Sequence, residues 1–430
     1  MRKLLKNESL TREERKVIFL SSLGGALEFY DFIIYVFFAS TLGHLFFPTK
    51  NHLASLIGVF AVFAVGYLIR PLGGVLLSHF GDTYGRKKTF VSTLLLMALP
   101  TFLIGLLPTY NQVGVWAAIG LTFLRLLQGL SVGGEIPGAI TFASEHVKPD
   151  KRGLTCSFIF FGINTGMLLG SLVSVLMTNY LSPEALLNWG WRIPFLLGGL
   201  LGVVSFYLRK RMAETPIFQA FYLKEEKRII PFLKVIREHF PEVIQSIGLA
   251  CLGAVVICLL FLFIPTYLSS ILHYPKGIIE SFNTINMIFF SFALVSAGWL
   301  SDTMGRRIFL LIGSIGFMTL GYALFFLLTR NNLPLVMMVM ILISLLSACI
   351  VGVYPCVLIE LFPTPVRYTG MAVSYNMSFG IFGGLSPLIA TYLIHQTGNV
   401  LAPSFYLTGS AICCFIAALF LKNQNKKQLI

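Results

Sequence analysis

Long apolar stretches alternate with short polar segments along the whole chain. The apolar stretches are roughly 18–25 residues long, enough for a helix to cross the ~30 Å hydrocarbon layer of a bilayer. This pattern predicts an all-α polytopic membrane protein. We expect twelve membrane-spanning helices, in the ranges 17–42, 53–79, 90–108, 113–142, 154–178, 192–209, 241–267, 278–300, 308–329, 333–361, 369–394 and 400–421.

The composition and the distribution of charge agree with this pattern. Of the 430 residues, 56% are hydrophobic and only 12% are charged, whereas about a quarter of the residues in ordinary soluble domains are charged. The formal net charge of +14 raises the question of a nucleic-acid partner. Most Lys and Arg residues, however, lie in alternate interhelical segments and at both chain ends, the bias that sets membrane topology. We therefore expect both termini in the cytoplasm, a lipid bilayer around the protein, and no nucleic acid.

Residue types that serve catalysis or metal binding do not gather into recognisable motifs. The seven cysteines are scattered or lie within apolar stretches, without C-x-x-C spacing. The sequence has no Ser/His/Asp constellation and no Walker A motif. It thus predicts neither an enzyme nor a metal or cofactor site. The short loops and the lack of a sorting signal favour the bacterial inner (cytoplasmic) membrane, and we expect a monomer.

Two polar motifs occur twice in the chain. GDTYGRKK at 81–88 returns as SDTMGRR at 301–307, and SEHVKPDKRG at 144–153 returns as IELFPTPVRYTG at 359–370. The repeat predicts two six-helix bundles, 1–208 and 241–430, joined by a central cytoplasmic loop, 209–240, that contains a surface helix. Transporters built from such parallel repeats bind their substrate near the membrane midplane, between the two halves.

The repeated motifs carry charges and glycines that can latch helix ends in one conformation and release them in another. A carboxylate there can accept hydrogen bonds from helix-end N–H groups or an arginine, and glycine permits a tight turn. The alternative is a solvated basic loop that only sets topology. The residues predicted to act in conformational gating are Asp82, Gly85, Arg86, Glu145, Arg152, Asp302, Arg306, Glu360 and Arg367.

Several strings resemble a known group of membrane proteins. GDTYGRKK resembles the loop motif of the major facilitator superfamily, although Ser78 and Thr83 depart from it. LEFYDFIIY, GYLIRPLGG, RLLQGLSVGGE, WGWRIPFLLGG, ETPIF and ELFPTPVRYTG together resemble the metabolite:proton symporters, the group with proline/betaine, citrate, shikimate and α-ketoglutarate carriers. The resemblance implies twelve helices in two bundles, alternating access, and proton-driven uptake of a small organic solute.

Three acidic residues lie inside predicted spans and away from the span ends, where ionisable groups are costly and usually face a functional cavity. Glu28 and Asp31 are spaced i, i+3 in the first span, so both project from one helical face. Two neighbouring carboxylates disfavour double ionisation, so one of them can hold a proton. Glu135 in the fourth span is the third candidate for proton coupling. The alternatives are a permanent ion pair between a first-span acid and Arg70 or Arg125, and a packing role for Glu135.

Arginines near the middle of spans two and four suit the carboxylate of a solute, bidentate if the geometry allows. A tyrosine lies on the acidic face of the first span. In span eleven the string YNMSFGIFGG combines aromatic, amide and hydroxyl groups, which could hold the apolar or quaternary-ammonium end of a solute. The residues predicted to bind the solute are Arg70, Arg125, Tyr35, Tyr375 and Asn376.

These observations predict a secondary transporter that takes up a small carboxylate-bearing metabolite together with protons. A zwitterion such as proline or betaine and a di- or tricarboxylate both fit two arginines that face an aromatic wall. A proton-driven exporter of a small organic solute with the same fold is the alternative.

Overall fold

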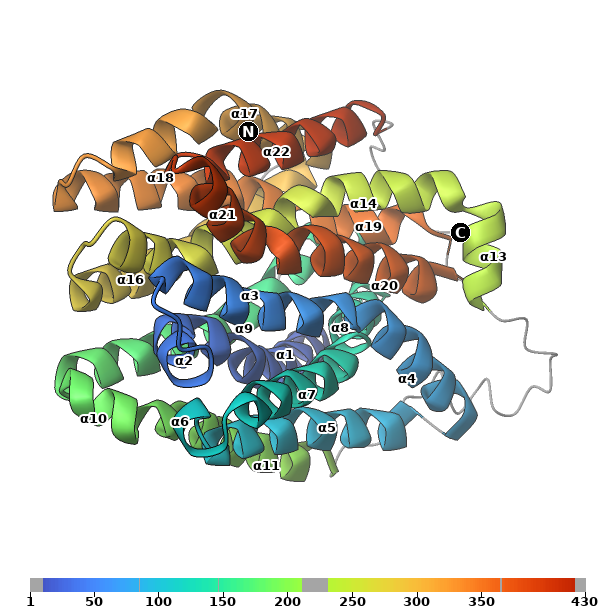
Figure 1. Ribbon diagram of the computed structural model, residues 1–430. Coiled ribbons are helices and arrows are strands. Elements are labelled where there is room, and N and C mark those ends of the chain that lie inside the picture. The colour runs from blue at the N-terminus through green and yellow to red at the C-terminus, as the bar shows by residue number, and fades with distance from the viewer. Residues whose placement is uncertain (1–10, 85, 146, 211–230, 364–365, 422–430) are drawn as a thin grey trace.

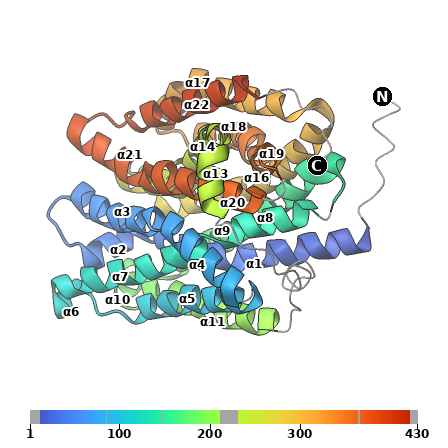
Figure 2. The ribbon, with the colours of Figure 1, turned by 90° about the vertical axis from the view of Figure 1, so that its right-hand side faces the viewer.

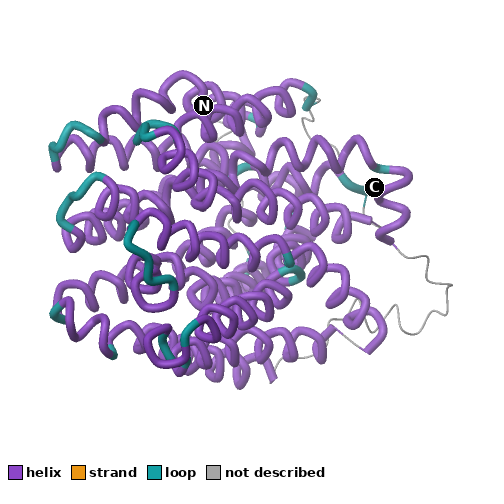
Figure 3. Tube along the Cα trace, viewed as in Figure 1, coloured by secondary structure: helices purple, strands orange, loops and turns teal. Residues whose placement is uncertain are grey.

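The computed structural model describes residues 11–84, 86–145, 147–210, 231–363 and 366–421, and within these ranges the chain forms helices and turns without strands (Figure 3). In the first part of the chain the helices are α1 (Arg12–Phe37), α2 (Ala39–Phe46), α3 (His52–Leu68), α4 (Arg70–Tyr84), α5 (Arg86–Leu106), α6 (Tyr110–Val113), α7 (Val115–Val132), α8 (Glu135–Glu145), η1 (Pro149–Lys151), α9 (Arg152–Tyr180), α10 (Pro183–Asn188), η2 (Gly190–Arg192) and α11 (Ile193–Lys210).

The second part of the chain repeats this long-helix architecture. Its helices are α13 (Pro231–Glu238), α14 (Phe240–Val255), η3 (Val256–Phe263), α15 (Ile264–Thr266), η4 (Tyr267–Ile271), α16 (Lys276–Met304), α17 (Arg306–Leu328), α18 (Leu333–Val351), α19 (Tyr354–Leu361), α20 (Arg367–Met377), η6 (Ser378–Gly383), α21 (Gly384–Thr397) and α22 (Pro403–Leu419).

Many of these helices are long and apolar enough to cross a membrane. Counted over the described residues there are eight, and a ninth results if the bent pair Phe29–Phe37 and Ala39–Phe46, which meet at 69°, forms one span. Shorter apolar helices, Leu95–Leu106, Gly190–Val203 and Pro403–Leu419, fall in three further predicted ranges. The multi-span, all-helical character predicted from the hydrophobic pattern is confirmed, while the number twelve stays a prediction.

The two parts of the chain lie one above the other. We call residues 12–210 the first half and residues 231–421 the second half. In Figure 1 the first half, blue to green, lies mostly below the second half, yellow to red. We call the interface between the two halves the seam. Across it, α9 lies beside α16, and α3 lies beside α21, as Figure 2 also shows for the latter pair. The predicted bundle limits, 1–208 and 241–430, stay a prediction.

Glycines bring α3, α4 and α7 into close contact within the first half. A Cβ atom on Gly129 would collide with the carbonyl oxygen of Gly66, and one on Gly73 would collide with that of Leu130. Small residues let membrane helices approach this closely. Because α3 and α4 carry the segment around Arg70 and α7 carries Arg125, this packing brings the two arginines to neighbouring positions.

Three segments of the second half wind more widely than an α-helix. Residues 256–263, 267–271 and 378–383 form π-helical turns, η3, η4 and η6. Such turns are rare and occur often at functional sites. The turn η6 lies within the string YNMSFGIFGG and carries Phe379, so it shapes the wall described below. The hydrophobic pattern did not predict these turns.

The segment between α16 and α17 reverses at a single residue. Gly305 has a φ of 97°, a conformation that favours glycine, and it belongs to the second copy of the repeated motif, SDTMGRR. The tight turn expected from the motif is therefore observed in this copy. Gly85, the predicted turn residue of the first copy, lies outside the described residues.

Only part of the predicted central loop is described. Residues 211–230 lie outside the described residues, and α13 covers 231–238. Val235 of α13 is buried against Phe362 and Val366, while Glu238 is exposed. A helix is thus present within 209–240, and its location on the membrane surface stays a prediction.

Candidate functional site

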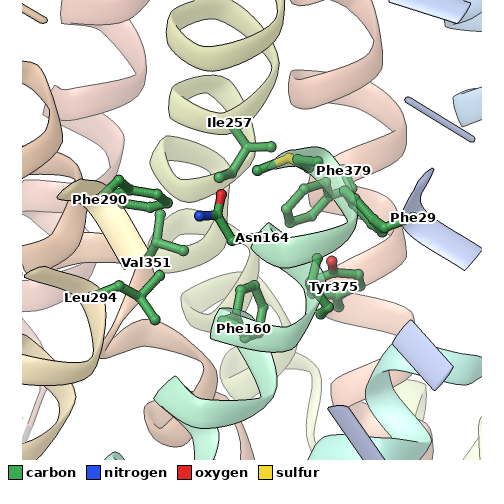
Figure 4. Close-up of a pocket in the computed structure, with 11 residues that line it drawn as sticks. Phe29, Phe160, Asn164, Ile257, Phe290, Leu294, Val351, Tyr375 and Phe379 are labelled. Atoms are coloured by element: carbon green, nitrogen blue, oxygen red, sulfur yellow. The ribbon is translucent and has the colours of Figure 1, made fainter. Parts of the chain in front are cut away.

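A narrow cavity lies between the two halves. The volume open to the centre of a water molecule is ≈ 10 Å³, about the room that one ordered water needs. Figure 4 shows aromatic and aliphatic side chains around it, with the amide of Asn164 directed into the space. The first half contributes Phe29, Phe160, Ile163, Asn164 and Met167, and the second half contributes Ile257, Phe290, Leu294, Val351, Tyr375 and Phe379.

Arg70 is fully buried, and none of its three side-chain nitrogens has a hydrogen-bond partner among the described residues. Its guanidinium lies instead among four aromatic rings. The Cζ atom is 4.9 Å from the ring centre of Tyr67, 5.7 Å from that of Phe379, and 5.8 Å from those of Phe32 and Tyr375. These distances are within the range of cation–π attraction. We call these four rings the Arg70 ring set.

Arg125 is also fully buried, and it lies on α7, which packs against the helix α4 that carries Arg70. Its Nη1 atom donates to the carbonyl of Phe32 over 3.1 Å and to Oε1 of Gln128 over 2.9 Å. Its Nε and Nη2 atoms have no hydrogen-bond partner. The guanidinium lies 4.3 Å from the ring centre of Phe32 and 4.4 Å from that of Tyr35. Nη1 of Arg125 is thus fixed by two hydrogen bonds, whereas its Nε and Nη2 donors remain available for a further acceptor.

The two arginines form a site of concentrated positive charge. Among the described residues no acidic side chain forms an ion pair with Arg70 or Arg125. A buried, uncompensated charge is strongly unfavourable, and a carboxylate that accepts bidentate hydrogen bonds compensates it. The geometry is therefore suited to receive an anion, and the rings beside it are suited to receive an apolar or cationic group.

Asp31 lies apart from the arginines. It is only 3% exposed, its Oδ1 atom has no hydrogen-bond partner, and a Cβ atom on Gly198 of α11 would come within 2.5 Å of that oxygen. The carboxylate thus faces α11. Asp31 therefore forms no ion pair with Arg70 or Arg125 in this structure, and the same alternative for Glu28 concerns a side chain outside the described residues. The cause is helical geometry, because consecutive residues project about 100° apart and it is Phe32 that contacts the arginines.

The three other residues predicted to bind the solute, Tyr35, Tyr375 and Asn376, differ in whether they face Arg125, the cavity or the seam. The hydroxyl of Tyr35 donates to the carbonyl of Val59 over 3.0 Å, so only its ring faces Arg125. Tyr375 lines the cavity and stacks on Phe379 with ring centres 4.4 Å apart. Asn376 donates from Nδ2 to the carbonyl of Gly133 across the seam, while its Oδ1 atom is buried without a partner. Asn376 thus joins the two halves, and a direct role in solute binding stays a prediction.

Asn164 is a cavity residue that the sequence interpretation missed. Its Nδ2 atom donates to the carbonyl of Met287 over 3.0 Å and to Oγ of Ser291 over 2.6 Å, both across the seam. Its Oδ1 atom is buried without a partner. A lone amide in the apolar string FIFFGINTGMLL was the available signal.

Charged residues join the two halves at the end where α16 finishes, which we call the Asp302 end. Nη1 of Arg367 lies 2.8 Å from Oε1 of Glu145. Asp302 accepts hydrogen bonds from the backbone N–H groups of Gly153 and Leu154 at the start of α9, both over 2.9 Å. The second half therefore caps an unsatisfied helix terminus of the first half.

Arg306 connects the remaining acids of this cluster within the second half. Its Nη1 atom lies 2.9 Å from Asp302, and its Nε and Nη2 atoms form a bidentate pair with Glu360 over 2.7 and 2.8 Å. Arg152 donates from Nε to the carbonyl of Ser144 over 3.3 Å. The structure thus brings together the described members of the predicted gating set.

The remaining predicted site residues cannot be placed in the same way. The side chains of Glu28, Glu135, Asp82 and Arg86 lie outside the described residues, although the helices that carry them are described. Gly85 is outside entirely.

The opposite end of α16, which we call the Glu280 end, has a second acidic contact that the sequence interpretation missed. Glu280 is buried, and its Oε1 atom accepts a hydrogen bond from Oγ of Ser174 over 3.0 Å. Lys276 lies 3.9 Å from the same carboxylate. Nearby, the hydroxyls of Ser171 and Thr284 lie 2.7 Å apart. The halves are therefore in contact at both ends of the α9–α16 seam.

Comparisons with known proteins identify the family. A family model described as "Sugar (and other) transporter" matches residues 17–229, and one described as "Major Facilitator Superfamily" matches residues 245–429. A glycine betaine/proline/ectoine/pipecolic acid transporter of Dickeya dadantii is 35% identical over 424 residues, which cover 96% of this chain and 84% of that protein. A proline/betaine transporter of Salmonella typhimurium is 35% identical, with coverage of 96% and 85%.

Solved structures show the same fold. A partially occluded inward-open structure of the xylose transporter XylE from E. coli matches with a TM-score of 0.76 at 17% identity, and covers 97% of this chain and 100% of that one. XylE bound to 6-bromo-6-deoxy-D-glucose, described as a proton:xylose symporter, matches with a TM-score of 0.75 at 17% identity, over 95% and 94% of the two chains. The chain is a multi-pass membrane transporter rather than an enzyme, and it belongs to the metabolite:proton symporter family of the major facilitator superfamily.

Proposed function

We propose that the protein imports a small zwitterion of the proline or betaine type together with protons. The observation that carries this proposal is the pair of buried arginines, Arg70 and Arg125, with unused donors and no described counterion. A solute carboxylate compensates their charge. The names of the similar transporters, which include glycine betaine, proline, ectoine and pipecolic acid, support a solute of this class.

A zwitterion fits the surroundings of the arginines better than a di- or tricarboxylate does. The Arg70 ring set and the cavity wall are mainly aromatic and aliphatic, and the polar groups that line the cavity, the amide of Asn164 and the hydroxyl of Tyr375, are uncharged. A second carboxylate of the solute would meet apolar groups there, which is costly. An alkylated ammonium group is instead attracted by aromatic faces.

The proposed topology has twelve spans, with both termini in the cytoplasm of a bacterial cell and the inner membrane around the protein. The Asp302 end then lies on the cytoplasmic side and the Glu280 end on the outer side. Bundles 1–208 and 241–430 rock against each other about the central loop, as is typical of parallel-repeat transporters. Contacts at both ends of the seam, together with the narrow cavity, support an occluded conformation. The protein functions as a monomer, without a cofactor.

Asp31 is the proposed proton carrier, with Glu28 and Glu135 as further candidates. A buried lone carboxylate is costly when ionised, and binding a proton removes that cost. Asp31 lies between α1 and α11, one residue before the Phe32 carbonyl that anchors Arg125. Solute binding at Arg125 and proton binding at Asp31 can therefore be coupled, because both change the contacts of the same turn of α1.

The repeated loops supply the proposed gate at the cytoplasmic side. Opening this side separates Asp302 from the start of α9 and Arg367 from Glu145, whose contacts are present in the closed form. Arg152, Arg306 and Glu360 take part through the same cluster, and Asp82, Gly85 and Arg86 are the matching residues of the first copy.

Uptake of labelled solute by proteoliposomes tests this function. We expect glycine betaine or proline to accumulate when the outside is acidic and not when the gradient is dissipated. Changing Arg125 to Gln, which removes the charge while leaving a donor, is expected to weaken apparent affinity about 10- to 100-fold, the value of a charge-assisted pair. Export of solute when the outside is acidic, the direction expected of a proton-driven exporter, contradicts the proposal, and so does accumulation that does not depend on the gradient.

A further inference from the structure

The guanidinium of Arg70 is held by groups that would suit a different cation equally well. Two rings of the Arg70 ring set, Phe32 and Tyr67, come from the first half, and the other two, Tyr375 and Phe379, come from the second. The latter two also line the cavity. The ring set therefore closes around a cation at the seam, next to the space that a solute would enter.

Arg70 itself gains little else from this position. All three nitrogens are buried without a hydrogen-bond acceptor, so the aromatic faces are its stabilising partners within the described structure. A guanidinium can form up to five hydrogen bonds and normally uses them for carboxylates when buried. A buried arginine with no acceptor is thus held in a position from which a carboxylate would withdraw it.

We propose that Arg70 occupies the aromatic site for the cationic end of the solute until the solute binds. On binding, the solute carboxylate draws the guanidinium of Arg70 toward itself, and the ammonium group of the solute takes over the rings that Arg70 leaves. This proposal rests on the proposed function, because it requires a solute with both charges. It assigns the Arg70 ring set to a quaternary or secondary ammonium group.

The arrangement gives a physical reason for selectivity. A cation without a carboxylate, such as choline, has no group that could pair with Arg70 and draw it away from the rings. Its positive charge would lie beside two guanidiniums with no negative charge to offset the repulsion. An anion without a cationic end would pair with the arginines but leave the rings empty. Only a zwitterion satisfies both partners, and Arg70 acts as the residue that excludes simple cations.

Removing Arg70 tests the proposal directly, with labelled choline as the probe. Purified wild-type protein and the variants Arg70→Met, Arg70→Gln, Arg70→Lys and Arg125→Gln are compared for binding of labelled choline and of labelled glycine betaine. In Arg70→Met and Arg70→Gln the rings are vacant, and choline affinity is expected to rise about tenfold or more. Arg70→Lys keeps a cation within reach of the rings, and Arg125→Gln leaves Arg70 on the rings, so neither is expected to gain choline binding.

The outcomes separate the two proposals. If wild-type protein binds no glycine betaine or proline, the proposed function fails, whatever choline does. If it binds them, but folded Arg70→Met and Arg70→Gln bind choline no better than wild type does, the ring-set proposal is overturned. An equal gain of choline binding in Arg125→Gln also overturns it, because loss of any positive charge would then suffice. The melting temperature of each variant identifies those that are folded.

Discussion

Arg367 of the second half and Glu145 of the first half form an ion pair over 2.8 Å, Nη1 to Oε1. The repeated motif places Glu360 and Arg152 at the matching positions, and a symmetrical protein would pair these two as well. Glu360 is instead held in a bidentate pair by Arg306, and Arg152 donates to a backbone carbonyl. The gate is therefore asymmetric, and one ion pair between acid and arginine crosses the seam among the described residues.

Reversing the charges of this pair tests its role in gating. Glu145→Arg and Arg367→Glu each place like charges together, so the closed form of the Asp302 end is destabilised and uptake is expected to slow several-fold. The combination of both changes restores the attraction and is expected to recover most of the rate. Initial uptake rates in proteoliposomes provide the measurement.

Glu184→Arg is a matched control, because Glu184 is exposed on the short helix α10 and no ion pair is formed with it among the described residues. The single changes should slow uptake and this control should not. A double variant no better than the worse single variant would show that the pair has no coupling across the seam.

Close packing of α9 and α16 at the Asp302 end depends on Gly298. A Cβ atom there would collide with Ser157 and lie 2.8 Å from the carbonyl oxygen of Gly153. Gly298→Val is therefore expected to lower the free energy of unfolding by about 1–3 kcal/mol, the usual cost of overpacking, and to reduce uptake. Thermal unfolding in detergent and uptake rates measure both effects.

Gly409→Val adds the same side chain where nothing lies within 4 Å, and it is expected to leave stability and uptake nearly unchanged. Equal effects of the two substitutions on stability and uptake would contradict a specific requirement for close packing of α9 and α16 at Gly298.

The contact of Glu280 with Ser174 predicts a latch at the other end of the seam. In Glu280→Ala the hydrogen bond is lost, and the Glu280 end is expected to open more often. Asn283 is buried one turn away on α16, and its side-chain amide has no partner, so Asn283→Cys serves as a reporter. We expect its labelling by a membrane-impermeant maleimide to become several-fold faster in Glu280→Ala.

Protein without the reporter corrects for labelling of the seven native cysteines. An equal labelling rate of Asn283→Cys with and without Glu280→Ala would contradict a role of Glu280 in closing this end. Faster labelling only in inside-out vesicles would instead assign this end to the cytoplasmic side, contrary to the proposed topology.

Asp31→Asn tests proton coupling at the buried carboxylate. Asparagine has nearly the same shape and cannot release a proton, so gradient-driven accumulation is expected to disappear, while exchange of labelled for unlabelled solute persists. Both assays use the same proteoliposomes. Accumulation at the wild-type level would remove Asp31 from the mechanism and leave Glu28 and Glu135 as candidates.

The hydrophobic pattern and the repeated motifs predicted much of the architecture. Apolar stretches are set by the thickness of the bilayer, and charged loop motifs are visible in the sequence without knowledge of contacts. The cluster of Glu145, Asp302, Arg306 and Arg367 follows from this repeat. Which acid pairs with which arginine did not follow, because the matched positions make symmetrical pairs look equivalent.

The interior of the site was less predictable. Spacing along α1 places Asp31 in the membrane, but only the rotation of the helix decides that Asp31 faces α11 and Phe32 faces the arginines. Rings recruited from both halves surround Arg70, and no local pattern encodes such long-range contacts. Glu280 was missed because it follows Lys276 near the start of an apolar stretch, a position typical of a solvated helix end.

The most direct test of coupled transport is the proton flux that accompanies solute entry. A pH-sensitive dye is sealed inside proteoliposomes, the membrane potential is held at zero with potassium and valinomycin, and glycine betaine is added outside without an imposed pH gradient. Proton-coupled uptake predicts that the interior acidifies as the solute enters, and that Arg125→Gln greatly slows this acidification at the same solute concentration. Solute entry through wild-type protein with no change of internal pH would contradict it.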